Sequence, residues 1–457
     1  MLTPDLLVRH ARPGPRYTSY PTVPVWQDDP PDSLLLDAVG ALDGPVSVYV
    51  HVPFCREQCT FCGCNMVVAR RQDVGDRFLD AIAAQLDSFP LPDQPLPLVR
   101  LHLGGGTPTW LTPTQLERLF GLLFARFTPA DGAELGVEAD PDVTTDAHLQ
   151  TLADLGVTRI SLGVQSLDPV VLHGVNRPQH TERIEELVTR ARTLGMRGLN
   201  LDLMYGLPHQ TMDRFVGTVR RILQMTPDRL ALFGYAHVPW LKRHQRALDE
   251  SALPGPVDRA ALFLAAQELL EEAGYVPIGL DHFARADDAL AVALGQGTLR
   301  RDFMGYTDRP HAPMIGLGPS SISELPKTAA GPARFAQQKS KLAAWWRSVE
   351  KGEPLLERGI LLTDEDRLRS DLIEELMCNL ALDLDALGAR YGLDLREHLK
   401  DELHALQPMA EEGLIQWSDA GFRVPDSHRL LVRNVAMVFD AYLKKPAPEG
   451  PRFSQTV

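Results

Sequence analysis

Residues 46–64 read VSVYVHVPFCREQCTFCGC, a β-branched run that leads directly into a dense group of cysteines. The alternation of valine with other residues predicts a strand over Val46–Val52 that ends at this loop. Four of the five cysteines of the chain lie here, with the spacing Cys-x3-Cys-x2-Cys-x-Cys: Cys55, Cys59, Cys62 and Cys64. Disulfide scaffolds spread their cysteines along short secreted chains, whereas this chain has 457 residues. The concentration therefore indicates a metal or redox site.

Three kinds of site could use such a loop. A structural zinc ion normally takes four ligands in two separated pairs, and no second pair follows here. A redox disulfide would need only Cys59 and Cys62 and would leave the neighbouring thiols without a use. An iron–sulfur cluster takes thiolates at neighbouring irons, which one short loop can supply. Three thiolates at these spacings would leave one iron of a [4Fe–4S] cluster open to a chelating cofactor.

Outward from this loop, strand-like runs alternate with amphipathic segments. Strands are predicted at Val46–Val52, Val99–Leu103, Glu134–Glu138, Arg159–Val164, Leu199–Met204 and Arg229–Tyr235. Helices are predicted between them at Asp76–Phe89, Thr114–Phe127, Thr181–Leu194 and Phe215–Met225. Six β-α units in sequence predict an α/β fold with a parallel sheet and right-handed crossovers. Each predicted strand ends in polar or glycine-rich residues, which favours a closed or open barrel with one functional face over a doubly wound sheet.

The chain divides into three predicted parts. Residues 1–34, rich in proline and glycine, form an N-terminal arm, and residues 35–345 form the barrel. Residues 346–457 form a mostly helical C-terminal domain. Its helices are predicted at Asp366–Cys378, Leu395–Leu406 and His428–Leu443, with a hairpin that pairs Leu414–Trp417 with Phe422–Val424.

The composition excludes several classes of protein. The chain has 60 acidic and 46 basic side chains and a formal net charge of −14, which argues against nucleic acid as the main partner. No apolar run approaches the roughly 18 residues that a membrane span needs. The N-terminal residues show no secretory signal pattern, so a cytoplasmic location is predicted.

The cysteine spacing after a first barrel strand, with Phe61 just before the third cysteine, resembles the signature of the radical S-adenosylmethionine (SAM) superfamily. A finer resemblance, to the oxygen-independent coproporphyrinogen III oxidase family, runs essentially from end to end. It rests on the order and spacing of many short motifs: RYTSYPT (16–22), CGCN (62–65), GGGTPT (104–109), GVQ (163–165), VNR (175–177), NLDLMYGLP (200–208), YAH (235–237), DHF (281–283), GYT (305–307), LMCN (376–379) and FDAYL (439–443). The resemblance implies a partial (β/α)6 barrel of radical SAM type.

The same resemblance implies a [4Fe–4S] cluster and two SAM molecules. The cluster ligands would be Cys55, Cys59 and Cys62, whereas Cys64 follows the family pattern without being a ligand. Positions that match contacts to the first SAM molecule are Tyr49, Gly105, Glu138 and Ile322. Positions that match contacts to the second are Phe61, Gly106, Thr107, Gln165, Arg177, Asp202 and Ala236. The residues implied in catalysis are Tyr49, Glu138, Phe303 and Ile322.

The implied activity belongs to heme biosynthesis. Two propionate side chains of coproporphyrinogen III would be oxidatively decarboxylated to vinyl groups by 5′-deoxyadenosyl radical chemistry, giving protoporphyrinogen IX. The reaction implies an anionic tetrapyrrole substrate and an external electron donor and acceptor, and we expect a monomer. Such a substrate needs local cations in an acidic protein, and the candidates are Arg16, Arg177, His282 and Arg285.

One departure from the family pattern bears on the substrate. Met304 stands where the family has a glutamine, and its thioether cannot replace the amide hydrogen bonds. Two alternative functions are a radical SAM methyltransferase of the related two-SAM class and a heme chaperone that resembles the oxidase. The RYTSYPT motif argues against both alternatives, and the fourth loop cysteine argues against the chaperone.

Overall fold

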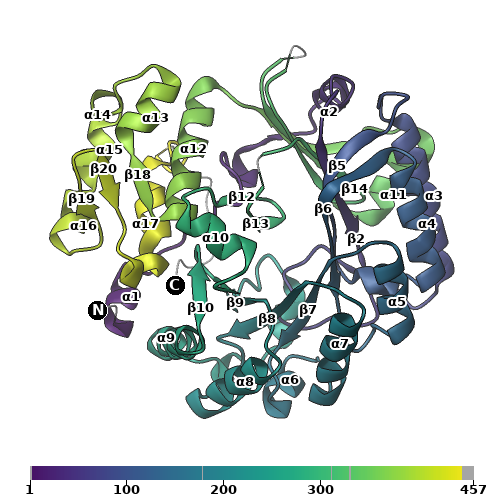
Figure 1. Cartoon of the computed structure of the whole chain (residues 1–457), viewed down its shortest axis with the longest axis horizontal. Helices are drawn as coiled ribbons and strands as arrows, with labels where there is room; N and C mark the ends of the chain where they lie inside the picture. Colours follow the sequence, from purple (N-terminus) through teal and green to yellow (C-terminus); the bar gives the residue numbers. More distant parts are fainter. Residues whose placement is uncertain (1–2, 178, 310, 329–330, 445–457) are drawn as a thin grey trace.

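One mixed sheet of 13 strands runs through the chain in this computed structural model (Figure 1). The structure describes residues 3–177, 179–309, 311–328 and 331–444, so residues 445–457 of the predicted C-terminal domain lie outside the described residues. The strand order is β1-β17-β16-β15-β14-β2-β5-β6-β7-β8-β9-β11-β10. The first and last strands of this order do not pair with each other in the described part of the chain. The sheet is therefore an open barrel.

Six neighbouring parallel strands form the centre of the sheet. They are β2 (Val46–Val52), β5 (Leu96–Gly105), β6 (Phe127–Ala139), β7 (Arg159–Gln165), β8 (Gly198–Tyr205) and β9 (Arg229–Gly234). They correspond one to one to the six predicted strands, and the predicted partial (β/α)6 barrel is confirmed. β5 and β6 are longer than predicted.

Further strands extend the sheet at both edges. Beside β2 lie β14 (Met314–Leu317), β15 (Ile322–Leu325), β16 (Arg334–Gln338), β17 (Leu356–Leu361) and β1 (Gln27–Asp28). Beside β9 lie β11 (His282–Arg285) and β10 (Tyr275–Ile278). Two small pairs of strands stand apart from the large sheet. β3 (Phe54–Cys55) pairs in parallel with β4 (Val67–Val68), and β12 (Arg300–Asp302) pairs antiparallel with β13 (Gly305–Thr307). Only β14 of the added strands is parallel to its inner neighbour β2, and the others pair antiparallel.

Crossover helices cover the outer face of the curved sheet (Figure 1). They are α3 (Asp73–Ser88), α4 (Pro113–Phe124), α5 (Asp146–Asp154), α6 (Pro169–Gly174), α7 (Thr181–Thr193), α8 (Met212–Gln224) and α9 (Pro256–Glu272). Thr112 begins α4 with a capping box to Gln115, and Thr145 begins α5 in the same way with His148. The predicted end of α4 at Phe127 is wrong, because Phe127 already begins β6. No helix in the described ranges is long and apolar enough to cross a membrane.

The remaining elements of the arm and barrel are short. They are α1 (Pro4–His10), η1 (Val23–Val25), α2 (Ser33–Val39), η2 (Pro108–Trp110), η3 (Arg243–Ala247), η4 (Glu250–Ala252), α10 (Ala289–Gly295) and α11 (Leu342–Lys351). The predicted barrel boundary at residue 345 falls inside α11, and β17 still belongs to the large sheet. The three-part division of the chain stays a prediction, and the sheet itself continues to Leu361.

The C-terminal part contains more breaks than predicted. Its elements are α12 (Asp364–Asn379), β18 (Ala381–Asp383), α13 (Leu384–Tyr391), α14 (Leu395–His398), α15 (Lys400–Ala405), α16 (Gln407–Glu411), β19 (Gln416–Trp417), β20 (Gly421–Arg423), η5 (Asp426–Leu431), α17 (Val432–Ala436) and η6 (Met437–Phe439). The predicted hairpin is confirmed as β19–β20. The predicted helix over 395–406 is interrupted at Leu399, where φ is −110° and ψ is 21°.

The prediction of one long helix over 428–443 is wrong. The segment forms two 3-10 turns around the short α17 because its polar side chains bind the N-terminal arm. Arg433 donates to the carbonyl of Pro15 at 3.0 Å, and Asn434 donates to that of His10 at 2.7 Å. These contacts join the two ends of the described chain, which periodicity within one segment cannot reveal.

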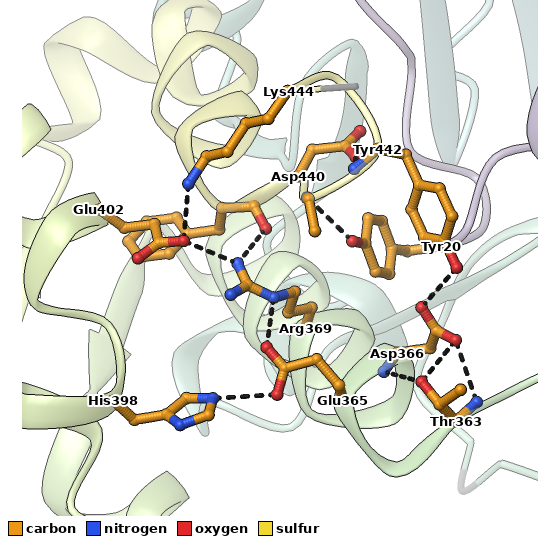
Figure 2. A network of polar contacts seen from close by, with 12 residues as sticks. Tyr20, Thr363, Glu365, Asp366, Arg369, His398, Glu402, Asp440, Tyr442 and Lys444 are labelled. Carbon is orange, nitrogen blue, oxygen red and sulfur yellow. Dashed lines mark hydrogen bonds and ion pairs between the residues drawn. The ribbon is translucent and has the colours of Figure 1, made fainter. Parts of the chain in front are cut away.

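A buried polar network fastens the end of the described chain to α12 (Figure 2). Arg369 donates to Glu365 at 2.6 Å and to Glu402 at 3.1 Å, and Lys444 also donates to Glu402, at 2.7 Å. The Tyr442 hydroxyl donates to the Asp366 carboxylate at 2.9 Å. The same segment reaches the arm, because the Ala441 N–H donates to the Tyr20 hydroxyl at 3.1 Å.

We predict that Arg369→Met lowers the free energy of unfolding by about 3 kcal/mol, because it leaves the buried Glu402 carboxylate without its guanidinium partner. Arg423→Met is the matched control in the same region, since its ion pair with Asp426 is exposed and should contribute less than about 1 kcal/mol. Urea denaturation of both variants measures the difference. Equal losses in the two variants would contradict the importance of the buried network.

Candidate active site

The cysteine loop leaves the carboxyl end of β2 and returns beside its own start. The pairing of β3 with β4 closes it, with the Val67 N–H donating to Pro53 O at 2.8 Å. The glycine turn after β5 lies directly against this closure: a Cβ at Gly106 would lie 2.7 Å from Phe54 O. Glycine is therefore required at position 106 for the two backbone segments to approach.

Each of the three predicted cluster ligands has a hydrogen-bonding group beside its sulfur. Thr107 Oγ1 lies 3.4 Å from Cys55 Sγ, Arg177 Nη1 donates to Cys59 Sγ at 3.3 Å, and the Cys64 N–H donates to Cys62 Sγ at 3.4 Å. The sequence LeuGlyGlyGlyThr and the loop spacing bring these groups together from different elements. Donors at a sulfur stabilise the thiolate, which is the metal-binding form.

The pKa values of these thiols respond to opposing influences. Burial raises the pKa of Cys55 to about 12 and also raises that of Cys59, although Arg177 opposes the shift at Cys59. Hydrogen bonds from Cys64 lower the pKa of Cys62. A positively charged cluster core would have to compensate for the burial of the first two thiolates.

The donor set fits an iron–sulfur cluster. Among the residues that the structure describes, no three cysteine, histidine or carboxylate side chains converge closely enough to hold a single metal ion. A tetrahedral zinc site needs such convergence, whereas a cluster takes each thiolate at a different iron. The loop thiols are therefore the kind of ligand that an iron–sulfur cluster takes, and the assignment of three of them as ligands stays a prediction.

Three polar side chains between residues 242 and 245, which the sequence did not point to, hold the loop from the other side. Lys242 donates to Cys64 O at 3.1 Å, His244 Nε2 lies 2.7 Å from Cys62 O, and Gln245 donates to Phe61 O at 3.1 Å. They come from the segment around η3, which has no period and no motif that would mark it. Its contact with the loop depends on the long connection after β9.

Gln245 also fixes the predicted residues Phe61 and Ala236 relative to each other. Its Nε2 donates to Ala236 O at 3.1 Å as well as to Phe61 O. Phe61 is buried with Tyr235 and Leu248 in a small apolar cluster beside the loop. The backbone carbonyls of both predicted residues are thus occupied by one amide.

Tyr49, His102 and Glu138 lie together on three neighbouring strands. Tyr49 pairs in register with His102, and their rings stack with centroids 6.1 Å apart. Glu138 lies 3.2 Å from His102 Nε2 and accepts from the Gly105 N–H at 3.1 Å. His51 Nδ1 lies 3.1 Å from the Tyr49 hydroxyl. Burial alone would raise the pKa of Glu138, but the hydrogen bonds from His102 and Gly105 outweigh it, so the pKa is lowered.

Asp202 and Gln165 form a second polar group on β7 and β8. Asp202 accepts from Ser161 at 3.1 Å and from Asn200 at 2.7 Å. Burial, and then the charge of Glu138, raises the pKa of Asp202 to about 6. Gln165 has a positive φ of 65°, at a register shift in β7. Its Oε1 is buried without a hydrogen-bond partner among the described residues, which leaves it available to a ligand.

Arg177 joins this group to the cysteine loop. Besides Cys59 it contacts Asp140 at 3.2 Å and donates to Gly163 O. Arg177 also lines a cavity of about 180 Å³ together with Cys55, Cys59, Thr107 and Asp140. The structure thus brings the loop, the glycine turn and the arginine to one hollow at the carboxyl ends of the strands.

Phe303 and Ile322 lie in a different cluster. Both pack against Trp26 and Phe335, and the Phe303 ring centroid is 6.0 Å from that of Trp26. Ile322 remains close to the first group, since its backbone lies against Gly316, which pairs with Tyr49. Phe303 lies at the β12–β13 turn, next to the unusual Met304, in the cluster that also contains Ile322.

The four predicted substrate cations are paired with carboxylates. Arg16 and His282 both bind Asp281, and Arg177 binds Asp140. Arg285 is half exposed and pairs with Asp287 at 3.2 Å. A substrate carboxylate would have to compete with these internal partners.

Comparisons with known proteins agree with this geometry. Residues 49–222 match the Radical SAM superfamily, and residues 362–431 match the HemN C-terminal domain. The chain is 39% identical over 443 residues to the oxygen-independent coproporphyrinogen III oxidase of Salmonella typhimurium, covering 97% of this chain and 96% of that one. It is 38% identical to the enzyme of the same name from Escherichia coli, with the same coverage. A solved structure of coproporphyrinogen III oxidase (HemN) from Escherichia coli, described as a radical SAM enzyme, superposes with a TM-score of 0.88 and 37% identity, covering 93% of this chain and 97% of that one.

We predict that Asp202→Asn stabilises the cofactor-free protein by about 2 kcal/mol at pH 8. Because the pKa of Asp202 is raised to about 6 in the folded state, its ionised carboxylate lowers the free energy of unfolding. This effect is complete above the folded pKa and vanishes below the unfolded pKa of about 4. Urea denaturation should therefore show the advantage of the variant shrinking as the pH is lowered from 7 to 4.5. A difference that is independent of pH would contradict the assignment.

Proposed function

Because the chain belongs to the oxygen-independent coproporphyrinogen III oxidase family, we propose that it decarboxylates two propionates of coproporphyrinogen III to vinyl groups, giving protoporphyrinogen IX for heme biosynthesis. The observation that carries the proposal is the hollow in which the cysteine loop, Thr107 and Arg177 meet at the carboxyl ends of the barrel strands. Radical SAM chemistry requires thiols at that place, together with polar groups that hold the cofactor.

In this proposal Cys55, Cys59 and Cys62 hold the [4Fe–4S] cluster. The chemistry that a bound, reduced cluster would supply there is the cleavage of SAM to a 5′-deoxyadenosyl radical, which would remove hydrogen from the substrate propionate. The protein contributes orientation and shielding. Thr107 and Arg177 stabilise the thiolates, and the contacts of Lys242 and His244 keep the loop in place.

Two groups of residues would hold the two SAM molecules. Glu138, kept ionised by its hydrogen bonds, can accept from the ammonium group of the first molecule, and Tyr49 lies beside it. Arg177 can bind the carboxylate of the second molecule. Gln165 and Asp202 offer acceptors for its ribose or ammonium group, and Gly106 and Ala236 would lie against it.

The wider proposal covers partners and location. An external donor supplies the electron for SAM cleavage, and an external acceptor takes the electron left after decarboxylation. We propose that a single chain is the working unit and that it acts in the cytoplasm without nucleic acid. Thiols that bind a cluster must stay reduced, which suits the reducing conditions of the cytoplasm.

We predict that Cys55→Ala, Cys59→Ala or Cys62→Ala abolishes cluster assembly, because each variant leaves one iron without its thiolate. Cys64→Ala and Cys378→Ala are the controls, one inside the loop and one buried in α12. Anaerobic reconstitution followed by iron quantification and paramagnetic resonance measures the outcome. A normal [4Fe–4S] signal in any of the first three variants would refute the ligand assignment.

The activity itself is tested with the anaerobically reconstituted protein, SAM, a reductant and coproporphyrinogen III. We expect protoporphyrinogen and 5′-deoxyadenosine to accumulate together. S-adenosylhomocysteine with a methylated product would replace the proposal by a methyltransferase. Stable heme binding without SAM cleavage would replace it by a chaperone function.

A further inference from the structure

A second and larger cavity lies away from the cysteine loop. It measures about 280 Å³ and lies between the arm, β15 and α12. Tyr17 to Tyr20, the middle of the RYTSYPT motif, form one wall, although nothing in the cluster site uses this motif. Phe335 lines the cavity and also packs in the cluster of Phe303 and Ile322, so the cavity borders the part of the barrel where those two residues lie.

The cavity carries an excess of positive charge in an acidic protein. Its charged lining residues are the cations Arg301, Lys327, Arg334 and Arg367, the acids Glu324, Asp371 and Glu374, and His311. The hydrogen bonds of His311 to Glu374, 3.1 Å to each oxygen, raise the pKa of the histidine, so it adds to the cations. Asp371 accepts from the Tyr391 hydroxyl at 2.8 Å and is thereby directed away from new ligands.

The cations that line this cavity have fewer carboxylate partners than the substrate-binding cations that were predicted from the sequence. Arg301 has no carboxylate within 4.0 Å among the residues described here, and its Nε has no hydrogen-bond partner there. Arg367 has only a long contact of 3.5 Å with Asp364, and Lys327 lies exposed at the rim without an ion pair in the described ranges. In contrast, Arg16 and Arg177 are held by Asp281 and Asp140. Carboxylates of a ligand would therefore meet available partners in this cavity.

Glu324 is the unusual acid of the cavity. It forms no hydrogen bond or ion pair with any described residue, and burial raises its pKa to about 7. It follows Ile322 by two residues on β15, so both side chains lie on the same face of the sheet. The Glu324 carboxylate is half-buried and has no donor among the described residues, so a ligand that supplies N–H donors would offset its partial desolvation.

We propose that this cavity seats the porphyrinogen substrate, with Glu324 accepting hydrogen bonds from the pyrrole N–H groups and with Arg367 and Lys327 binding propionates. This inference rests on the proposed function and adds the substrate subsite to it. A porphyrinogen is a flexible macrocycle whose four pyrrole N–H groups can converge on one anion, while its carboxylates project from the rim. One central carboxylate within a rim of cations complements that pattern.

The test measures anaerobic binding of coproporphyrinogen III at pH 8, where Glu324 is ionised, to the reconstituted protein and its variants. Glu324→Gln, Arg367→Gln and Lys327→Gln should each raise the Kd by about tenfold, the loss expected for one charge-assisted hydrogen bond. Arg347→Gln on α11, an exposed arginine paired with Glu353, is the matched control and should bind as the unsubstituted protein does. Cleavage of SAM in the absence of substrate should be unchanged in the Arg347→Gln control, which lies outside both sites.

The outcomes separate this inference from the proposed function. If the unsubstituted protein makes protoporphyrinogen and the Glu324, Arg367 and Lys327 variants bind the substrate normally, the cavity is not its seat. If Glu324→Gln does not fold, the exposed Arg367 and Lys327 variants decide the same question. An effect in those two variants with none in Glu324→Gln would overturn the role of the carboxylate. A protein that binds and converts no coproporphyrinogen at all would overturn the proposed function instead.

Discussion

The close approach of two backbone segments at the carboxyl ends of β2 and β5 is the constraint on which the site depends. A Cβ at Gly106 would collide with Phe54 O, and one at Gly104 would lie 2.9 Å from Glu138 Oε1. Because glycine allows both contacts, Thr107 lies beside the Cys55 thiol and the Gly105 N–H reaches the Glu138 carboxylate.

Charge inside the barrel is organised in local pairs. Arg100 and Arg159 both lie 3.4 Å from the buried Glu134, and Arg100 also binds Asp302 at 2.8 Å. Because charges are paired locally in this way, the net charge of −14 does not predict the local charge of any one cavity. An anionic substrate depends on the few cations that internal carboxylates leave available. In this structure Arg301, Arg367 and Lys327 are such cations, and they line the cavity between the arm and α12.

Local patterns predicted the centre of the fold well. All six parallel strands and four of the helices between them follow from the hydrophobic period and from the glycines at segment ends, which are local features of one segment. The segment over 428–443 was mispredicted because Arg433 and Asn434 bind the backbone of the arm, more than 400 residues away. The loop contacts of Lys242 and His244 were missed for the same reason, since no period marks a side chain that binds a distant carbonyl.

The sequence by itself determined the strand order along the chain, the thiol spacing that suits a three-ligand cluster, and the family to which these motifs belong. Those properties depend on residues that are close together in the sequence, so they can be recognised from the sequence alone. Only the tertiary structure decided which cations pair with internal carboxylates and which cavity acid has no partner among the described residues. It also decided how the arm forms one wall of that cavity. These properties arise where segments distant in sequence meet, because burial and electrostatic pairing depend on what surrounds a side chain in space.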